Sequence, residues 1–236
     1  VNLPAMTECP ELLKSVSTIV VLDHHRQNNE TIKNAVVSYV EPYASSTCEM
    51  VAEILQYIVD KPKLKNIEAD AMYSGILVDT DNFVIKAGVR TFEAPAFLRR
   101  AGADVTRVRK MFREDMEHCR IRTAIINKAE IYMDEFAIST FDGANVSGAT
   151  VVGAKAANAL LNIQGIRGSF VLTSLQDCVY ISVRSIDELN VQVIMEKFNG
   201  GGHLTMAAAQ LKNVTLEEAK QQLEDVLQQM REDGDI

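Results

Sequence analysis

The sequence has 236 residues, 47% of them hydrophobic, which is enough for one large or two modest domains. No apolar run approaches the about 20 residues that span a bilayer, and the four scattered cysteines are typical of reduced thiols in a cytosolic protein. The formal net charge of −8 argues against a protein that binds long nucleic acid through its phosphates. A small phosphate ligand, bound by metals and a few local cations, is compatible with that charge.

The first half of the chain alternates strand-like and helix-like segments. The apolar, β-branched segment Thr18–Leu22 is predicted as a strand buried on both faces, and Val36–Val40 as a second short strand. Predicted helices run from the capping box Ser46–Glu49 to Pro62, from a cap at Asn66 to Asp79, and over 91–101. This rhythm of strands and helices predicts a parallel α/β sheet.

The pattern changes near residue 115, where a charged segment from Glu114 to about Lys128 is predicted as a helix that connects two domains. The strands predicted beyond it are Ala137–Thr140, Phe170–Leu175 and Val179–Val183. The helices predicted beyond it are Thr150–Leu161, Val191–Phe198 and one that begins at the capping box Thr215–Glu218. We therefore expect domains at 1–114 and 131–236, joined by a linker helix at 115–130, the second being α+β with a mixed sheet.

The tripeptide Asp23-His24-His25 follows the first predicted strand. In open α/β sheets, ligands bind at the carboxyl ends of the strands. Two adjacent residues that leave a strand point in different directions, so one imidazole could bind a metal while its neighbour faces a substrate. Asp23 could orient one of the two imidazoles. The alternative is a turn with two exposed histidines.

Asp79 and Asp81 lie at the end of the helix predicted from Asn66. Negative charge at a helix C-terminus costs about 0.3–1 kcal/mol, and a bound cation would remove that cost. Carboxylate oxygens together with an imidazole nitrogen suit manganese, magnesium or zinc. The alternative is that both aspartates are ordinary polar residues at the end of a helix.

Three glycines and a histidine stand together at 200–203. Each glycine costs about 1 kcal/mol in a regular element, but glycine is suitable where the backbone approaches a ligand such as a phosphate. The alternative is a flexible loop. Arg184 ends a predicted strand and could supply a charged fork for a phosphate or stack on a base. The basic cluster at 107–113 is instead interpreted as a solvated helix face.

Four motifs stand along the chain: VLDHH at 21–25, GILVDTDNF at 75–83, RTFEA at 90–94 and GGGH at 200–203. The set resembles the DHH phosphoesterase superfamily, which pairs a DHH domain with a smaller DHH-associated domain and includes RecJ-type exonucleases and nano-RNases. Segments 41–46 and 91–104 look most like the cyclic di-AMP phosphodiesterases of the GdpP type. The resemblance covers nearly the whole chain.

The resemblance implies a role for each matching residue. His24 corresponds to a metal ligand, His25 to the catalytic histidine that contacts the substrate phosphate, and Asp79 to a ligand of a metal pair. Gly201, Gly202 and His203 correspond to the loop that binds the nucleotide phosphate or sugar. The implied cofactors are two divalent ions, usually manganese, around a hydroxide that hydrolyses cyclic di-AMP to linear pApA.

One part of the family pattern is absent, because the remaining ligands belong to an upstream His-x-Asp-x-Asp motif and to an aspartate on a second strand. No residues here supply the first motif, and Val1-Asn2 resembles the tail of the second. We therefore expect an N-terminally truncated fragment with an incomplete metal site, inactive alone. By the resemblance, the parent is anchored in the membrane and this part is a cytoplasmic module without membrane contact.

Two alternatives to a cyclic dinucleotide phosphodiesterase stay open. One is a nano-RNase or phosphoadenosine phosphatase that acts on short oligonucleotides. The other is a non-catalytic nucleotide-binding module, although intact His24, His25 and Asp79 argue against it. In each case the expected partner is a small nucleotide, and association as a homodimer is left open.

Overall fold

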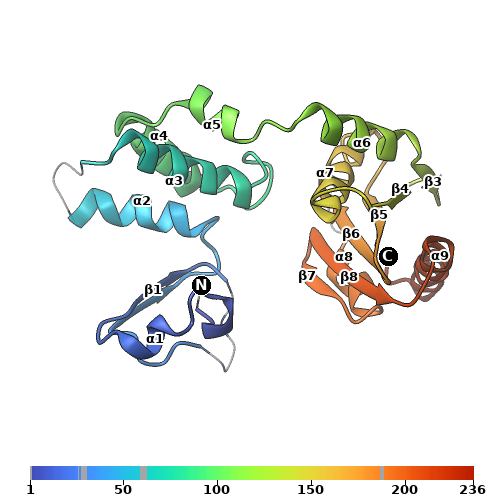
Figure 1. Cartoon of the computed structure of the whole chain (residues 1–236), viewed down its shortest axis with the longest axis horizontal. Coiled ribbons are helices and arrows are strands. Elements are labelled where there is room, and N and C mark those ends of the chain that lie inside the picture. The colour runs from blue at the N-terminus through green and yellow to red at the C-terminus, as the bar shows by residue number, and fades with distance from the viewer. Residues whose placement is uncertain (1, 26, 28–30, 59–62, 187–188) are drawn as a thin grey trace. The chain divides into compact units, whose positions relative to one another are not determined.

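The computed structural model describes residues 2–25, 27, 31–58, 63–186 and 189–236 (Figure 1). The chain divides into an N-terminal unit, Val1–Arg113, and a C-terminal unit, Glu114–Ile236. Among the described residues, no helix combines the length and the apolar character needed to cross a membrane. The fold class is mixed α/β, as predicted, with a parallel sheet in the first unit and a mixed sheet in the second.

The sheet of the N-terminal unit consists of two parallel strands, β1 (Val20–Asp23) and β2 (Val37–Val40), in which Asp23 pairs with Val40. The predicted parallel pairing is confirmed. The expectation that both faces of β1 are buried is wrong, because Val20 is 57% exposed while Val21 and Asp23 are buried; Val37 of β2 is also 52% exposed. Side chains alternate between the faces of a strand, so these two strands have one covered face and one open face.

Helices make up the rest of the N-terminal unit. They are η1 (Pro4–Met6), α1 (Leu12–Ser15), α2 (Thr47–Ile58), α3 (Asn66–Asp79), α4 (Val89–Arg100) and α5 (Val105–Met111). Helices α2, α3 and α4 pack together around a core of small and branched side chains, including Ala52, Ala69, Ile76 and Leu98. Small alanines in this core allow the three helices to approach closely, and this packing fixes the position of Asp79 at the end of α3.

The predicted starts of α2 and α3 differ in detail from the starts that the structure contains. Ser46 Oγ accepts a hydrogen bond from the N–H of Glu49 at 3.0 Å, as the capping box requires, while the Glu49 carboxylate accepts one from Ser45 Oγ. Asn66 is the first residue of α3 and not its cap. The cap is the preceding Lys65, whose N–H donates to Glu68 at 2.8 Å. Pro62, the predicted end of α2, lies outside the described residues.

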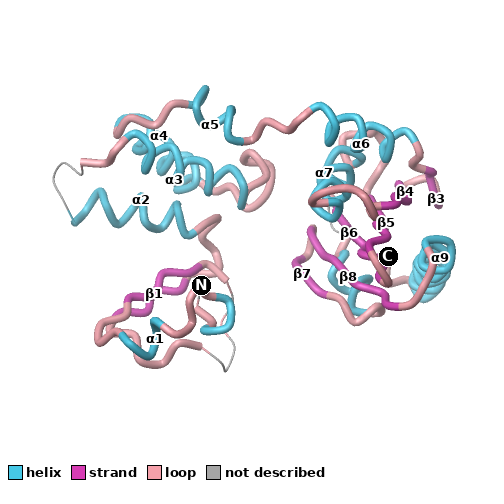
Figure 2. Tube along the Cα trace, viewed as in Figure 1, coloured by secondary structure: helices cyan, strands magenta, loops and turns pink. Residues whose placement is uncertain are grey.

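The C-terminal unit contains a six-stranded sheet in the order β3-β4-β5-β6-β8-β7 (Figure 2). Only β4 and β5 are parallel, and α7 connects them. The strands are β3 (Glu130–Tyr132), β4 (Phe136–Asp142), β5 (Gly168–Leu175), β6 (Cys178–Ser185), β7 (Gly201–His203) and β8 (Met206–Lys212). The two strands predicted at Phe170–Leu175 and Val179–Val183 form an antiparallel hairpin, and Gln176 takes a positive φ of 55° in the turn between β5 and β6.

Helices pack against both faces of this sheet, but part of one face stays open, where Ala208 and Gln210 of β8 are exposed. They are α6 (Met116–Asn127), α7 (Ala149–Leu160), α8 (Val191–Glu196) and α9 (Leu216–Asp233). Ile125 of α6 and Ala156 of α7 share one core with Val171, while Phe170 lies in the core that contains α8 and α9. The segment predicted as a connector is therefore helical and packs within the C-terminal unit. The predicted capping box of α9 is present.

Strands β3 and β8 are absent from the predicted set, and β7 was expected as a loop. The sequence of β8 is MAAAQLK, and alanine is depleted in strands and favoured in helices. Its place between β6 and β7 makes it a strand, because there it pairs on both edges. Tertiary pairing has overridden local propensity in this segment.

Candidate active site

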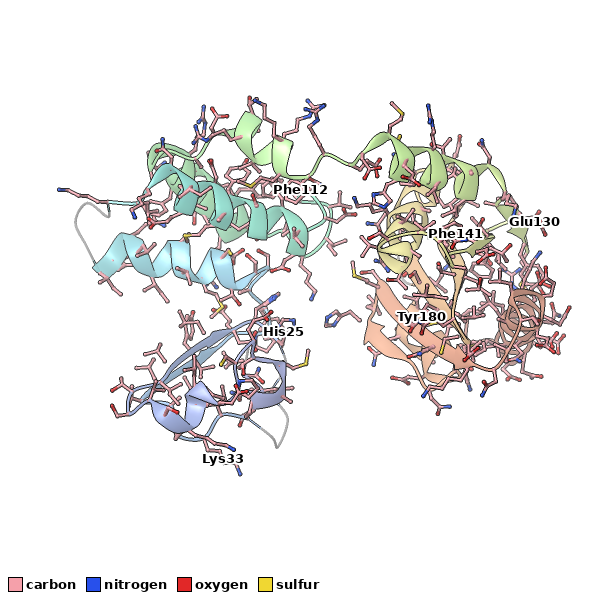
Figure 3. All side chains as sticks on the ribbon, in the orientation of Figure 1. His25, Lys33, Phe112, Glu130, Phe141 and Tyr180 are labelled. Carbon is pink, nitrogen blue, oxygen red and sulfur yellow. The ribbon has the colours of Figure 1, made fainter. Side chains whose placement is uncertain are left out.

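The turn after β1 is organised by the Asp23 carboxylate, which is buried at the end of the strand. Its Oδ1 accepts hydrogen bonds from the backbone N–H of His24 at 2.8 Å and of His25 at 3.2 Å. The same oxygen lies 2.7 Å from Nδ1 of the His25 ring. Asp23 therefore orients the second histidine of the pair. Figure 3 labels His25 at the end of the β1 ribbon.

The charge state of Asp23 follows from these contacts. Burial alone would raise its pKa, but the hydrogen bonds from the ring and the backbone of His25 outweigh burial and hold the pKa below the usual value. Asp23 is therefore a carboxylate at neutral pH. As a carboxylate it accepts from Nδ1–H of His25, which leaves Nε2 on the ring edge away from Asp23.

His24 lies in a different environment from its neighbour. Its side chain is 10% exposed, against 56% for His25, and its Nε2 lies 3.6 Å from Oδ2 of Asp79 at the end of α3. Burial lowers the pKa of His24, an effect that the charge of Asp79 opposes, and burial raises the pKa of Asp79. His24 therefore presents a neutral imidazole, the form in which histidine binds metals.

This pair fits a divalent cation. A separation of 3.6 Å is too long for a hydrogen bond, but it suits two ligands that each lie about 2.0–2.2 Å from one ion. An imidazole nitrogen with a carboxylate oxygen is a donor set for zinc, manganese or magnesium. Among the described residues, no group of three or more histidine, cysteine, aspartate or glutamate side chains could hold a metal. The described part of the chain thus brings together two of the ligands such an ion needs.

The backbone after Asp79 is strained. Asp81, Asn82 and Phe83 follow one another with φ values of 44°, 59° and 68°, a region that side chains other than glycine rarely occupy. The buried hydroxyl of Thr80 supports this turn, because it accepts from the N–H of Phe83 at 3.0 Å. Strain of this kind persists only where the surroundings impose it, and it concentrates at functional sites. Asp81, the second carboxylate named at the end of this helix, lies in the strained turn that follows α3.

Arg184 and His203 lie on the same face of the sheet in the C-terminal unit. Arg184 of β6 and His203 of β7 both pair with Met206 of β8, the strand between them. Paired residues on neighbouring strands share a face, so the two side chains stand on the same face, about 10 Å apart. Arg184 Nη1 also donates to the carbonyl of Val183 at 2.8 Å. Figure 3 labels Tyr180, which lies on the same face of β6, four residues before Arg184.

The three glycines of the GGGH motif differ in how much space a side chain would have at each position. A Cβ on Gly200 or Gly202 would come within 2.3 Å of the carbonyl oxygen of Ala208 or Met206, so both glycines are needed for β8 to approach. Gly202 also has a φ of 154°. A Cβ on Gly201 would meet no atom within 4 Å. The predicted ligand-binding role therefore has structural room at Gly201, while Gly202 is already explained by packing.

Two family models match the chain. The DHH family, N-terminal domain, matches residues 2–76, and the DHHA1 domain matches residues 137–232. The chain is a DHH–DHHA1 protein. Curated relatives include the cyclic-di-AMP phosphodiesterase PdeA of Listeria monocytogenes, 45% identical over 93% of this chain and 34% of the relative. GdpP of Bacillus subtilis, also named a cyclic-di-AMP phosphodiesterase, is 38% identical over 98% of this chain and 35% of the relative.

The DHH–DHHA1 chain thus spans about a third of the length of these curated relatives. Among solved structures, an exopolyphosphatase-related protein from Bacteroides fragilis matches 98% of this chain and 69% of its own with a TM-score of 0.83. Their sequence identity is 20%, so this likeness supports the fold alone.

Sequence reasoning missed several residues that contact the DHH turn. Asn2 is buried, and its Nδ2 donates to the carbonyl of His25 at 3.2 Å. The backbone N–H of Glu41 donates to the carbonyl of Asp23 at 2.9 Å. Lys86 contributes positive charge near both His24 and Asp79. Glu41 opens the quoted segment 41–46 and Lys86 follows the motif at 75–83, but only the folded chain shows that both lie near the turn.

Proposed function

We propose that this DHH–DHHA1 chain forms the nucleotide-hydrolysing part of a metal-dependent phosphodiesterase that converts cyclic di-AMP to linear pApA. The observation that carries the proposal is the arrangement of the DHH turn: a neutral, buried His24 faces Asp79, while Asp23 directs an exposed His25 outward. The names of relatives with 38–45% identity support the choice of substrate. The metal and the product are parts of the proposal.

His24 and Asp79 would hold a divalent cation, manganese being the one we expect. When bound, the cations supply charge stabilisation at the phosphate and a strong nucleophile at neutral pH. His25 would present Nε2 to a phosphate oxygen, because its Nδ1–H already donates to Asp23; Nε2 donates to that oxygen when the ring is in its doubly protonated imidazolium form. The buried carboxylate of Asp23 stabilises that form and holds the ring in one orientation.

The C-terminal unit would bind the nucleotide. Its open sheet face offers the guanidinium of Arg184 and the imidazole of His203, both paired with Met206 in register. Met206 lies between these two side chains, and the next row of residues on the same face contains Ala208 and Gly201, which are small and exposed. A guanidinium and an imidazole at this spacing suit a phosphate or a base, and the small residues leave room for the ligand to lie on the sheet.

Product analysis on the whole natural protein tests the proposal. The protein is depleted of metal with a chelator, supplied with manganese, magnesium or zinc in turn, and given cyclic di-AMP, pApA, a short RNA and a small chromogenic phosphodiester. Metal-dependent conversion of cyclic di-AMP to pApA is the expected result. A preference for short RNA would favour the nano-RNase alternative and contradict the proposal, as would activity that survives complete metal removal.

The role of the open face is tested with His203→Ala. One lost hydrogen bond to a charged group is worth about 1.5–3 kcal/mol, so cyclic di-AMP hydrolysis should fall about 10- to 100-fold. Hydrolysis of the small chromogenic substrate should change little, because that substrate carries no nucleotide for His203 to bind. An equal loss on both substrates would show that His203 serves the catalytic centre or the fold.

A further inference from the structure

Arg90, in the first turn of α4, bonds two glutamates, and one of them, Glu41, opens the quoted segment 41–46. Its Nη1 donates to Oε1 of Glu41 at 2.6 Å, and its Nη2 lies 3.3 Å from Oε2 of the same carboxylate. Its Nε and Nη2 also donate to Oε2 of Glu53 on α2, at 3.1 and 2.5 Å. The guanidinium therefore joins α4 to α2 and to the residue that follows β2. Two parallel hydrogen bonds fix the direction of the Glu41 side chain as well as its distance.

Glu41 in turn holds the DHH turn through its backbone. Its N–H donates to the carbonyl of Asp23 at 2.9 Å, and its own carbonyl accepts from the N–H of Ala44 at 3.1 Å. The hydroxyl of Tyr39 donates to Oε2 of Glu41 at 2.6 Å. Both the side chain and the backbone of Glu41 are thus engaged. A shift of Glu41 would move the peptide group that connects Asp23 to His24.

We propose that Arg90 is a positioning residue for the DHH turn, acting through Glu41 on the geometry of Asp23, His24 and His25. The inference rests on the proposed function, since it assigns Arg90 to that same site. The contact path is short: guanidinium to carboxylate, then backbone N–H to the carbonyl of Asp23. A flexible lysine at this position would keep the positive charge and lose the fork, so the fork itself can be tested.

The chain offers a matched control in Arg107. Its Nε and Nη2 donate to the two oxygens of buried Asp70 at 2.6 and 3.1 Å, which ties α5 to α3. This pair resembles the one formed by Arg90 in geometry and lies in the same unit. None of its described hydrogen bonds involves residues 23–25 or 41–44. Loss of this fork should loosen the unit without moving the DHH turn.

The experiment compares Arg90→Lys, Glu41→Gln and Arg107→Lys with the unchanged whole protein. Manganese affinity is measured by calorimetry, thermal stability by unfolding, and the Asp23–His25 contact by the NMR shift of the His25 ring in metal-free protein. Loss of a residue that supports metal ligands costs about 10- to 100-fold in metal affinity. We expect such a loss, and a moved His25 signal, in Arg90→Lys and Glu41→Gln. Arg107→Lys should change stability alone.

Combining Arg90→Lys with Glu41→Gln should add little further loss, because both changes break the same path. If Arg90→Lys and Arg107→Lys lower stability alike and leave manganese affinity and the His25 signal unchanged, Arg90 is merely structural and the inference is overturned. The NMR readout needs neither metal nor turnover. Failure of the unchanged protein to cleave cyclic di-AMP would therefore contradict the proposed function, while the Arg90 test would still give its own answer.

Discussion

Gly75 offers a sharp test of the packing that places Asp79. It lies inside α3, one helical turn before Asp79, and a Cβ at this position would come within 2.4 Å of Sγ of Cys48 on α2. Overpacking a core by a methyl group costs about 1–3 kcal/mol, whereas alanine in a helix interior gains about 1 kcal/mol over glycine. Gly75→Ala should therefore lower the free energy of unfolding of the N-terminal unit by about 0–2 kcal/mol.

Removing the obstructing sulfur should reverse the sign of this change. The next nearest atom to the added Cβ is Cβ of Cys48 at 3.4 Å, an ordinary contact distance. Cys48→Ala alone should cost about 1 kcal/mol of burial. In the double variant, the new methyl group occupies the space of the sulfur, so the helix gain remains without the clash. We expect a favourable coupling energy of about 1–3 kcal/mol between the two substitutions.

Hydrogen exchange of the α2 and α3 amides is a suitable assay, because it reports the opening free energy of this unit separately from the other. All four proteins are measured under identical reducing conditions. Additivity of the two substitutions within about 0.3–0.5 kcal/mol would refute the reasoning, since it would mean that Gly75 and Cys48 do not share the space that the structure assigns them. A shift of Asp79 should accompany Gly75→Ala and weaken metal binding in that variant alone.

Three further predictions concern charge, metal and backbone. The hydrogen bonds from its arginine partner hold the pKa of Asp70 below the usual value. The ion pair of Asp70 with Arg107 therefore stabilises the folded protein above the unfolded-state pKa of Asp70, about 4. This stabilisation is lost as the pH falls through the lower pKa that Asp70 has in the folded protein. Asp70→Asn should flatten the acid-induced fall of the urea midpoint, and an unchanged fall would refute this. In the whole protein, His24→Ala should lose metal and activity, while His25→Ala should keep most of the metal and lose turnover; equal metal loss would contradict that division. Gly202→Ala should lower the melting temperature, whereas Gly201→Ala should leave it unchanged. A loss of nucleotide binding in Gly201→Ala would then show that the nucleotide approaches the backbone at Gly201.

Much of the fold follows from local signals in the sequence. Hydrophobic periodicity and the Thr215 capping box are consistent with the helices that the structure contains, and the apolar, β-branched runs are consistent with β1, β5 and β6. The segments that were predicted wrongly owe their structure to partners distant in the sequence. The alanine-rich segment Met206–Lys212 becomes a strand only because β6 and β7 pair with it, and the glycines before it are needed for that approach. No window of neighbouring residues carries this information.

The candidate site shows the same division between local and distant information. Strand geometry predicts that adjacent histidines point apart, but the two rings lie edge to face with centroids 4.4 Å apart. Which of them is less exposed and lies against Asp79, 55 positions from His24 in the numbering, depends on the folded chain. Asp23 completes the arrangement, because its Oδ1 accepts from both backbone N–H groups and contacts Nδ1 of the His25 ring, while Nε2 of His24 lies 3.6 Å from Asp79. The two imidazoles thus have different neighbours before any ligand arrives, and the order Asp-His-His is what makes the first a ligand and the second a donor to substrate in the proposed reaction.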